Sequence, residues 1–116
     1  MPDEISRFLP LSPAVLHILL CLAGEPRHGY GIMQEVARQS NGQYKLGPGT
    51  LYDNLQTLMT QRLVEEAPRP RDEDPRRRYY RLTGLARRVL AADVERLEAV
   101  VKEASLRLRG PRPRRV

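Results

Sequence analysis

The feature that most constrains the fold is a long stretch near the C-terminus that contains neither proline nor glycine. It runs from Leu85 to Leu108, before Gly110 and Pro111 interrupt the chain, and such a stretch predicts a single helix. Its apolar side chains are spaced alternately four and three residues apart, as in a coiled coil; they are Leu90, Val94, Leu97, Val101, Ala104 and Leu108. We expect residues 84–108 to form a dimerisation helix with these side chains at the interface.

The alternative is that this helix folds back onto its own chain. Leu85 and Val89, at its start, could pack on the preceding domain while the later residues pair across a dimer. The chain has 116 residues, which is about the length of one domain. An apolar stripe this long on so small a domain favours a second copy as its partner.

Three shorter helices are predicted upstream. Ser12 and Pro13 form an N-cap followed by proline at the first helical position, which starts a helix over 13–23. The apolar spacing predicts a second helix over 29–40 and a third over 48–62. In the third helix the leucines expected to face inward are Leu51, Leu55 and Leu58.

Two short strands are expected after the third helix. Residues 63–66 and 78–83 have strand-like composition, and the loop 67–77 between them holds three prolines. The predicted fold class is therefore mainly α with a small two-stranded β-hairpin, a winged helix-turn-helix followed by a long C-terminal dimerisation helix. The domains are then the winged-helix domain (1–83), the dimerisation helix and a basic tail (109–116), whose composition predicts disorder.

The positive charge of the chain is concentrated in two places. The net charge is +6, of which residues 69–81 contribute +3 and residues 109–116 contribute +4, whereas residues 1–68 are slightly acidic. A localised basic excess is typical of proteins that bind polyanions such as double-stranded DNA. The alternative is that each arginine run is only a solvated surface.

The third predicted helix has the features of a DNA-reading helix. In a winged helix-turn-helix, the helix before the hairpin lies in the major groove. The outward side chains here are short hydrogen-bonding groups that suit base edges, namely Thr50, Asp53, Asn54 and Thr57. The helix begins at Gly47-Pro48-Gly49-Thr50, where free N–H groups can meet a phosphate, and Lys45 lies just upstream. The alternative is an ordinary solvated helix face.

The loop of the hairpin supplies arginines that we expect to contact phosphates or the minor groove: Arg69, Arg71, Arg76, Arg77 and Arg78. Asp72, Glu73 and Asp74 dilute their charge. The alternatives are a flexible charged loop and, for the whole protein, a winged-helix module that binds a protein and has lost operator recognition. The diluted loop and the acidic Asp53 support this second alternative.

The sequence gives no indication of a catalytic or metal site. His17 lies inside an apolar helix, and His28 is a turn residue expected to cap the second helix. The single cysteine, Cys21, lies among apolar residues and is expected to be a core residue. We predict no enzyme activity, no cofactor and no metal. The acidic N-terminus and the short apolar runs predict neither a secretory signal nor a membrane span, so we expect a cytoplasmic protein.

Four segments resemble the PadR family of bacterial transcriptional regulators: Leu11–Leu20, His28–Ile32, Gly47–Tyr52 and Arg77–Thr83. They occur in the family's order and together extend over about residues 11–108. The resemblance implies a winged-helix domain with a single C-terminal dimerisation helix, as in the short subfamily. It also implies a homodimeric repressor that binds a palindromic operator and is released by an effector.

The resemblance also implies roles for individual residues. Those that match phosphate-contacting or groove-entering positions are Tyr30, Pro48, Gly49, Thr50 and Tyr52, and those that match the basic wing are Arg76, Arg77 and Arg78. Arg62 departs from the pattern, because the family often has glycine there. Some relatives stack planar ligands between tryptophans, but this chain has no Trp. A small aromatic effector would have to contact tyrosines, Phe8 or aliphatic residues near the dimer interface.

Overall fold

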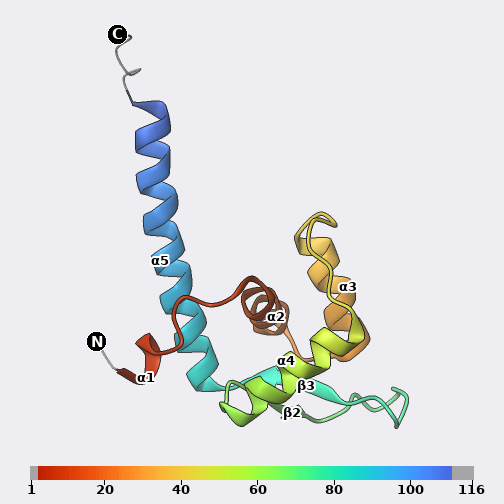
Figure 1. Cartoon of the computed structure of the whole chain (residues 1–116). Helices are drawn as coiled ribbons and strands as arrows, with labels where there is room; N and C mark the ends of the chain where they lie inside the picture. The colour runs from red at the N-terminus through yellow and green to blue at the C-terminus, as the bar shows by residue number, and fades with distance from the viewer. Residues whose placement is uncertain (1–2, 111–116) are drawn as a thin grey trace.

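The computed structural model describes residues 3–110 and is mostly helical, with one small sheet (Figure 1). The elements in chain order are α1 (Asp3–Ser6), α2 (Pro13–Gly24), β1 (Arg27–His28), α3 (Gly29–Gln39), α4 (Pro48–Thr60), β2 (Val64–Ala67), β3 (Tyr79–Leu82) and α5 (Gly84–Arg109). The predicted fold class is confirmed, with one change to the sheet. Of the tail predicted to be disordered, Arg109 is the last residue of α5, and residues 111–116 lie outside the described part of the chain.

The sheet has three strands rather than the two that the sequence predicts. β1 pairs antiparallel with β3, with Arg27 opposite Tyr80 and His28 opposite Tyr79, and β3 pairs antiparallel with β2, so that the order is β1-β3-β2. The expectation that His28 is a turn residue is therefore wrong, because His28 is the second residue of β1. A strand of two residues has no periodicity of its own, and here it is defined by pairing with residues about fifty positions away.

Helix α4 ends two residues before the predicted end at residue 62, in a left-handed turn. Arg62 has a φ of 64°, a conformation that costs a residue with a β-carbon roughly 1–2 kcal/mol. The N–H of Leu63 donates to the carbonyl of Leu58 at 2.9 Å, which closes the last turn as in a Schellman motif. This turn directs the chain from α4 straight into β2.

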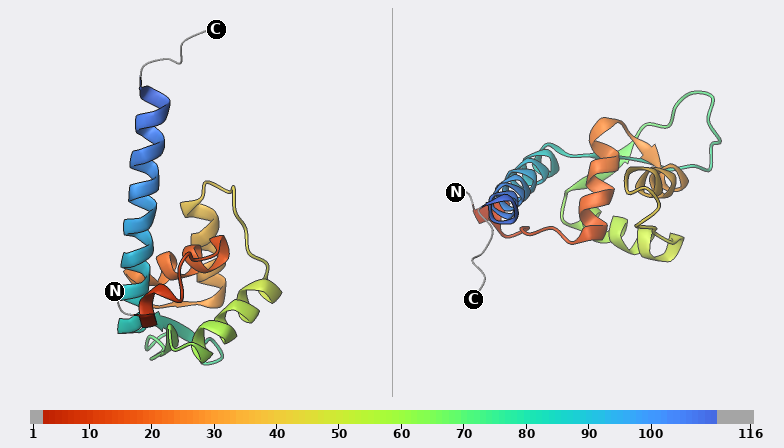
Figure 2. Two further views of the ribbon diagram at one scale, coloured as in Figure 1. Left: turned by 60° about the vertical axis from the view of Figure 1, so that its left-hand side comes forward. Right: turned by 90° about the horizontal axis from the view of Figure 1, so that it is seen from above.

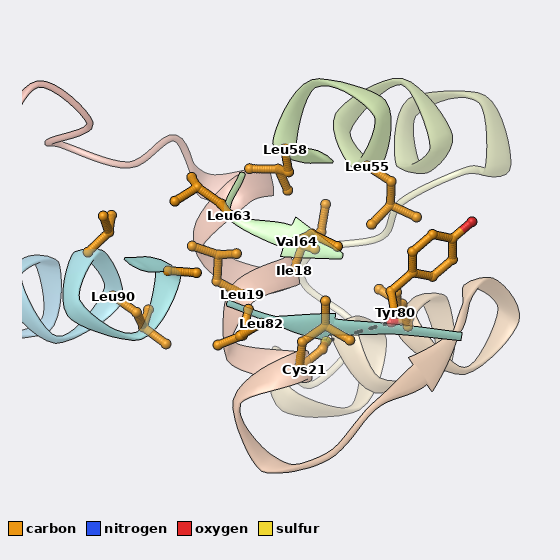
Figure 3. Packing of buried hydrophobic residues seen from close by; sticks show 14 of the residues in the cluster. Ile18, Leu19, Cys21, Leu55, Leu58, Leu63, Val64, Tyr80, Leu82 and Leu90 are labelled. Carbon is orange, nitrogen blue, oxygen red and sulfur yellow. Dashed lines mark hydrogen bonds between the residues drawn. The ribbon is translucent and has the colours of Figure 1, made fainter. Parts of the chain in front are cut away.

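The hydrophobic core lies where α2, α3, α4, the sheet and the first turns of α5 meet (Figure 3). Leucines from α4 pack over Val64 of β2, and Tyr80 of β3 lies beneath Leu55. Both Tyr79 and Tyr80 are buried. Cys21 is buried as predicted, and burial raises the pKa of its thiol to about 11.

Helix α1, which the sequence did not indicate, packs against α5. Ile5 joins the core, and the Glu4 carboxylate lies 3.5 Å from the Arg88 guanidinium. Farther along α5, the carboxylate of Asp93 is completely buried and accepts a hydrogen bond of 2.8 Å from Arg96. α1 thus covers part of the first half of α5.

The start of α5 is hydrogen-bonded to the turn after α4. The Thr83 hydroxyl accepts from the N–H of Ala86 at 3.1 Å, as an N-cap, and donates to the carbonyl of Arg62 at 2.7 Å. The N–H of Thr83 also donates to the carbonyl of Leu63 at 3.1 Å. Helix α5 is therefore anchored to the segment that joins α4 to the sheet.

The second half of α5 extends away from the remaining elements (Figures 1 and 2). The radius of gyration is 17.4 Å, whereas a compact chain of this length would have about 13 Å. Leu90, predicted to lie at a dimer interface, is instead buried in the core of its own chain. It lies on the same face as Ala86 and Val89, where α5 packs on the rest of the domain. The prediction that Leu90 lies at the dimer interface is therefore wrong.

Candidate nucleic-acid interface

Helix α4 buries one face and presents the other to solvent. Leu51, Leu55 and Leu58 point into the core, as predicted. The side chains exposed on the other faces include Thr50, Asp53, Gln56, Thr57 and Thr60. The sequence prediction omitted Gln56 and Thr60, although the helical period of the three leucines places both residues opposite the buried face.

The first turn of α4 is open to an external acceptor. Gly47, at the N-cap, makes no side-chain hydrogen bond to the helix, and Pro48 has no N–H. The exposed Gly49 and Thr50 therefore carry N–H groups that the helix itself does not satisfy. Lys45 is exposed just upstream. This is the arrangement in which helix N-termini bind phosphate oxygens.

The amide of Asn54 is not free. Its Nδ2 donates to the carbonyl of Thr50 at 2.8 Å, and the residue is half-buried. Asn54 was predicted to face a base edge, but in the unbound chain one of its donors is committed to its own helix. The rotamer that makes this bond cannot be deduced from the position of the residue in the sequence.

A cleft of about 270 Å³ brings α3, α4 and the hairpin loop together. Its walls include predicted site residues that are far apart in the sequence: Tyr30, Tyr52, Arg76, Arg77 and Arg78. The tyrosines keep 59% and 47% of their surface exposed. Guanidinium groups and phenolic hydroxyls converging on one cleft form a site suited to phosphate.

Tyr52 is positioned by α3. A β-carbon at Gly29, the first residue of α3, would overlap the Tyr52 hydroxyl. Since Gly29 is buried, this glycine provides the space that brings the α4 side chain against the start of α3. The tyrosine therefore links two helices at the edge of the cleft.

The hairpin loop, residues 68–78, projects on the side of the domain away from α5 (Figures 1 and 2). Two of its arginines are held by its own carboxylates: Arg76 donates to Asp74 at 3.0 and 3.2 Å, and Arg77 donates to Glu73 at 3.3 Å. Hydrogen bonds from Arg76 lower the pKa of Asp74. Among the described residues, Arg71 and Arg78 form no ion pair. Two of the five predicted loop arginines are thus neutralised within the loop.

The loop is tied to the domain through Glu73. The hydroxyl of Tyr79 donates to Glu73 at 2.7 Å, which lowers the pKa of the carboxyl group, while burial and this bond raise the pKa of Tyr79. The predicted alternative of a loose charged loop does not account for this contact. The Glu73 carboxylate therefore accepts from both the Tyr79 hydroxyl of β3 and the Arg77 guanidinium of the loop.

His28 stands between α3 and the loop. Its Nδ1 accepts from the N–H of Gly31 at 3.1 Å, which confirms the predicted cap, and its Nε2 lies 3.0 Å from Nη1 of Arg77. A neutral imidazole has a single acceptor nitrogen, so it can accept from only one of these donors at a time. Burial, and then the nearby Arg77, lower the pKa of His28.

The apolar stripe of α5 changes character along its length. Val94 and Leu97 are half-buried, whereas Val101, Ala104 and Leu108 are exposed. The exposed fraction reaches 62% at Val101 and 87% at Leu108. Val100 and Leu106, which lie outside the predicted stripe, are also exposed. The uncovered apolar surface is therefore wider than the spacing of the stripe indicated.

Most of the chain matches a known protein family. The sequence pattern of the family described as "Transcriptional regulator PadR-like family" matches residues 16–92. This chain belongs to the PadR-like family. A curated relative, the "Transcriptional regulator Rv3488" of Mycobacterium tuberculosis, is 36% identical over 88 residues, which are 76% of this chain and 78% of the relative. The fold and family make the chain a winged-helix, DNA-binding regulator of transcription.

Solved structures of PadR regulators share the fold. The PadR-like regulator of Bacillus cereus superposes with a TM-score of 0.72 at 20% identity, covering 91% of this chain and 100% of the other. The PadR family regulator of Clostridium difficile R20291 gives 0.69 at 20% identity, covering 84% and 99%. Both matches extend over most of this chain and nearly all of the other, so the fold as a whole is shared.

Two kinds of feature are absent from the described residues. No helix between residues 3 and 110 combines the length and apolarity needed to cross a membrane. Within the same range, no group of three or more histidine, cysteine or acidic side chains is arranged to hold a metal ion.

Proposed function

We propose that this PadR-like regulator is a repressor that acts as a homodimer on a palindromic operator and is released by a small aromatic effector. The observation that carries the DNA-binding part is the cleft shared by Tyr30 of α3, Tyr52 of α4 and the arginines of the loop. A phosphate held there would fix the domain on the duplex with α4 beside the major groove.

The proposed DNA contacts fall into two groups. One group contacts the phosphate backbone of the DNA and lies at the start of α4 and around the cleft. Its members are Tyr30, Lys45, Pro48, Gly49, Tyr52, Arg69, Arg71, Arg76, Arg77 and Arg78. Those that face the groove are Thr50, Asp53, Asn54 and Thr57. All except Asn54 are exposed in the unbound chain, as the proposal requires.

The proposed homodimer rests on the second half of α5. From Glu98 onward nearly every residue of this helix is exposed, and an isolated helical segment of this kind is marginally stable in water. A second copy of α5, packed along Val94, Leu97, Val101, Ala104 and Leu108, would cover the apolar surface. Two-fold symmetry would then present two copies of α4 to a palindromic site.

A measurement of binding to DNA from upstream of the protein's own gene tests the proposal. Affinity should fall steeply as salt rises, because cations are released from neutralised phosphates. Arg78→Ala should weaken binding and reduce the slope of log K against log salt by about one. Arg38→Ala removes the same charge from the exposed end of α3 and should leave both values unchanged. Salt-independent binding, or none, would overturn the proposal.

The effector is tested in the same assay. The support for it is the resemblance to the family, together with the partly buried Phe8 against the core near α1. A panel of phenolic and other aromatic compounds should include at least one that releases the DNA. If every compound that binds the protein leaves operator affinity unchanged, effector control by this class is excluded.

The competing function is a winged-helix module that binds a protein rather than an operator. The pairing of Arg76 with Asp74 and of Arg77 with Glu73 favours it, because these arginines are already neutralised. The two functions differ in the effect of α4 substitutions. A Thr50→Ala and Thr57→Ala double variant should lose sequence preference if α4 reads DNA, and should behave as wild type towards DNA if it does not.

A further inference from the structure

The polar side chains of α4 differ in whether they are already hydrogen-bonded. Asn54 donates to the carbonyl of Thr50 at 2.8 Å, and the hydroxyl of Thr60 donates to the carbonyl of Gln56 at 3.1 Å. Both are therefore partly engaged with their own helix. The side chain of Gln56 is exposed and makes no hydrogen bond within residues 3–110. It is the one amide on the outer face of α4 with all its donors and acceptors free.

Gln56 also lines a depression in the protein surface. A depression of about 450 Å³ runs between α4 and the hairpin, and its lining includes Gln56, Tyr52, Met59 and Arg78. Gln56 is one turn of helix beyond Tyr52, and Met59, 38% exposed, is the next residue along the same side. An amide, a thioether and a guanidinium thus border one space beside the helix.

We propose that Gln56 is the base-reading amide of α4 and that it recognises the adenine of an A·T pair in the major groove. This inference rests on the proposed DNA-binding function. A carboxamide can donate to N7 and accept from the N6 amino group of adenine at the same time, a pairing that no other base offers. The methyl end of Met59 provides an apolar contact for the 5-methyl group of thymine.

The neighbouring side chains explain why the role falls to Gln56. Asp53 carries a charge that only accepts hydrogen bonds, which suits the amino group of cytosine rather than adenine. Arg78, on the hairpin side of the depression, is free of ion pairs among the described residues. A phosphate contact from Arg78 would set the register of α4 without reading sequence, so the base specificity at this position belongs to Gln56.

Selection from a library of randomised duplex DNA tests the inference. The wild-type chain should enrich a palindromic site, and Gln56→Ala should lose the preference for A·T at one position in each half-site. Its affinity for the wild-type site should fall roughly 5- to 150-fold. Gln56→Glu should move the preference at that position towards C·G, because a carboxylate accepts from the amino group of cytosine. Gln61→Ala is the matched control, because it removes another exposed amide at the C-cap of α4, and it should enrich the wild-type site.

The outcomes separate this inference from the proposed function. If the wild-type chain enriches a site and Gln56→Ala enriches the same one, the inference is wrong and the DNA-binding function stands. If Asn54→Ala rather than Gln56→Ala loses the A·T position, Asn54 leaves Thr50 on binding and the inference is again wrong. A wild-type chain that enriches no sequence overturns the proposed function and the inference with it. Because Gln56 is exposed, unchanged thermal unfolding of each variant will show that the fold is intact.

Discussion

The hydroxyl of Tyr52 on α4 occupies the space that a β-carbon of residue 29 would need, at the first position of α3. This contact sets how closely the two helices approach at the cleft. It also makes the side chain at position 29 a determinant of where the tyrosine ring lies.

Gly29→Ala should therefore displace Tyr52 and destabilise the protein by about 1 kcal/mol, as overpacking does. Urea unfolding would measure the change, and adding Tyr52→Ala to the variant should recover most of it. Gly24→Ala is the control, since no atom lies within 4 Å of its added β-carbon. If the effects of Gly29→Ala and Tyr52→Ala simply add, the two residues are not coupled.

Replacement of Arg62 by glycine should stabilise the chain. Arg62 has a φ of 64°, and glycine adopts that region without steric cost, so we expect a gain of about 1 kcal/mol in the free energy of unfolding. Arg87→Gly makes the same chemical change in the exposed first turns of α5, where glycine should cost about 1 kcal/mol. A loss of stability in both variants would show that the left-handed turn is not strained.

Removal of the wing carboxylate at Asp74 should tighten DNA binding. Asp74→Asn frees Arg76 from its 3.0 Å ion pair and lets the guanidinium reach a phosphate, so the salt dependence should also steepen by about one unit of slope. Asp72→Asn removes an equal charge from a residue that forms no ion pair within the described chain. The difference between the two variants measures the ion pair itself. Equal effects would mean that only the net charge of the loop matters.

Stability should decrease on acidification through the titration of His28. The pKa of this imidazole is lower in the folded chain than its usual 6.5, because burial and Arg77 disfavour the charged ring. The unfolded chain then binds the proton more readily, so the stability present above pH 6.5 is lost as the pH falls through the folded pKa. Thermal unfolding between pH 7.5 and 5.5 should show this loss. His28→Asn, which can still cap α3 but does not titrate there, should show a shallower decline.

A charge placed on the exposed half of α5 should dissociate the proposed dimer. Val101→Asp puts a carboxylate in the centre of the apolar stripe, and analytical ultracentrifugation should then find a monomer with unchanged helix content. Ala99→Asp, on the opposite face of the same exposed turn, should leave the mass unchanged. If the wild-type protein is itself a monomer at micromolar concentration, the homodimer is excluded.

Elements with a strong local pattern were predictable, and those defined by distant partners were not. Helices α2, α3, α4 and α5 each carry a cap, a period or a glycine that can be recognised in the sequence. β1 has only Arg27 and His28, and it exists because Tyr79 and Tyr80 of β3 pair with them. α1 is a four-residue helix held by its contact with α5, which no local signal indicates.

The same division applies to the candidate site. The spacing of Leu51, Leu55 and Leu58 correctly predicts which face of α4 is buried. The spacing of apolar residues in α5 also placed Leu90 in the same stripe as Val101. Spacing alone cannot distinguish the core of the chain from an interface with a second copy. Hydrogen bonds within the chain, such as that between Asn54 and Thr50, depend on side-chain rotamers and on the tertiary surroundings, so only the structure reveals them.

Because α5 is hydrogen-bonded to the turn after α4, a rotation of this helix would move the winged domain with it. Thr83 fastens one end through its bonds to Arg62 and Leu63, and a helix of 26 residues is about 39 Å long. In a dimer joined along the far half of α5, the helices would cross roughly 29 Å from Thr83, so a change of about 10° in the crossing angle would shift the two winged domains relative to each other by roughly 5 Å. Substitutions in the apolar stripe of α5 would then change the half-site spacing that the proposed dimer accepts. The residues that contact the bases would remain unchanged.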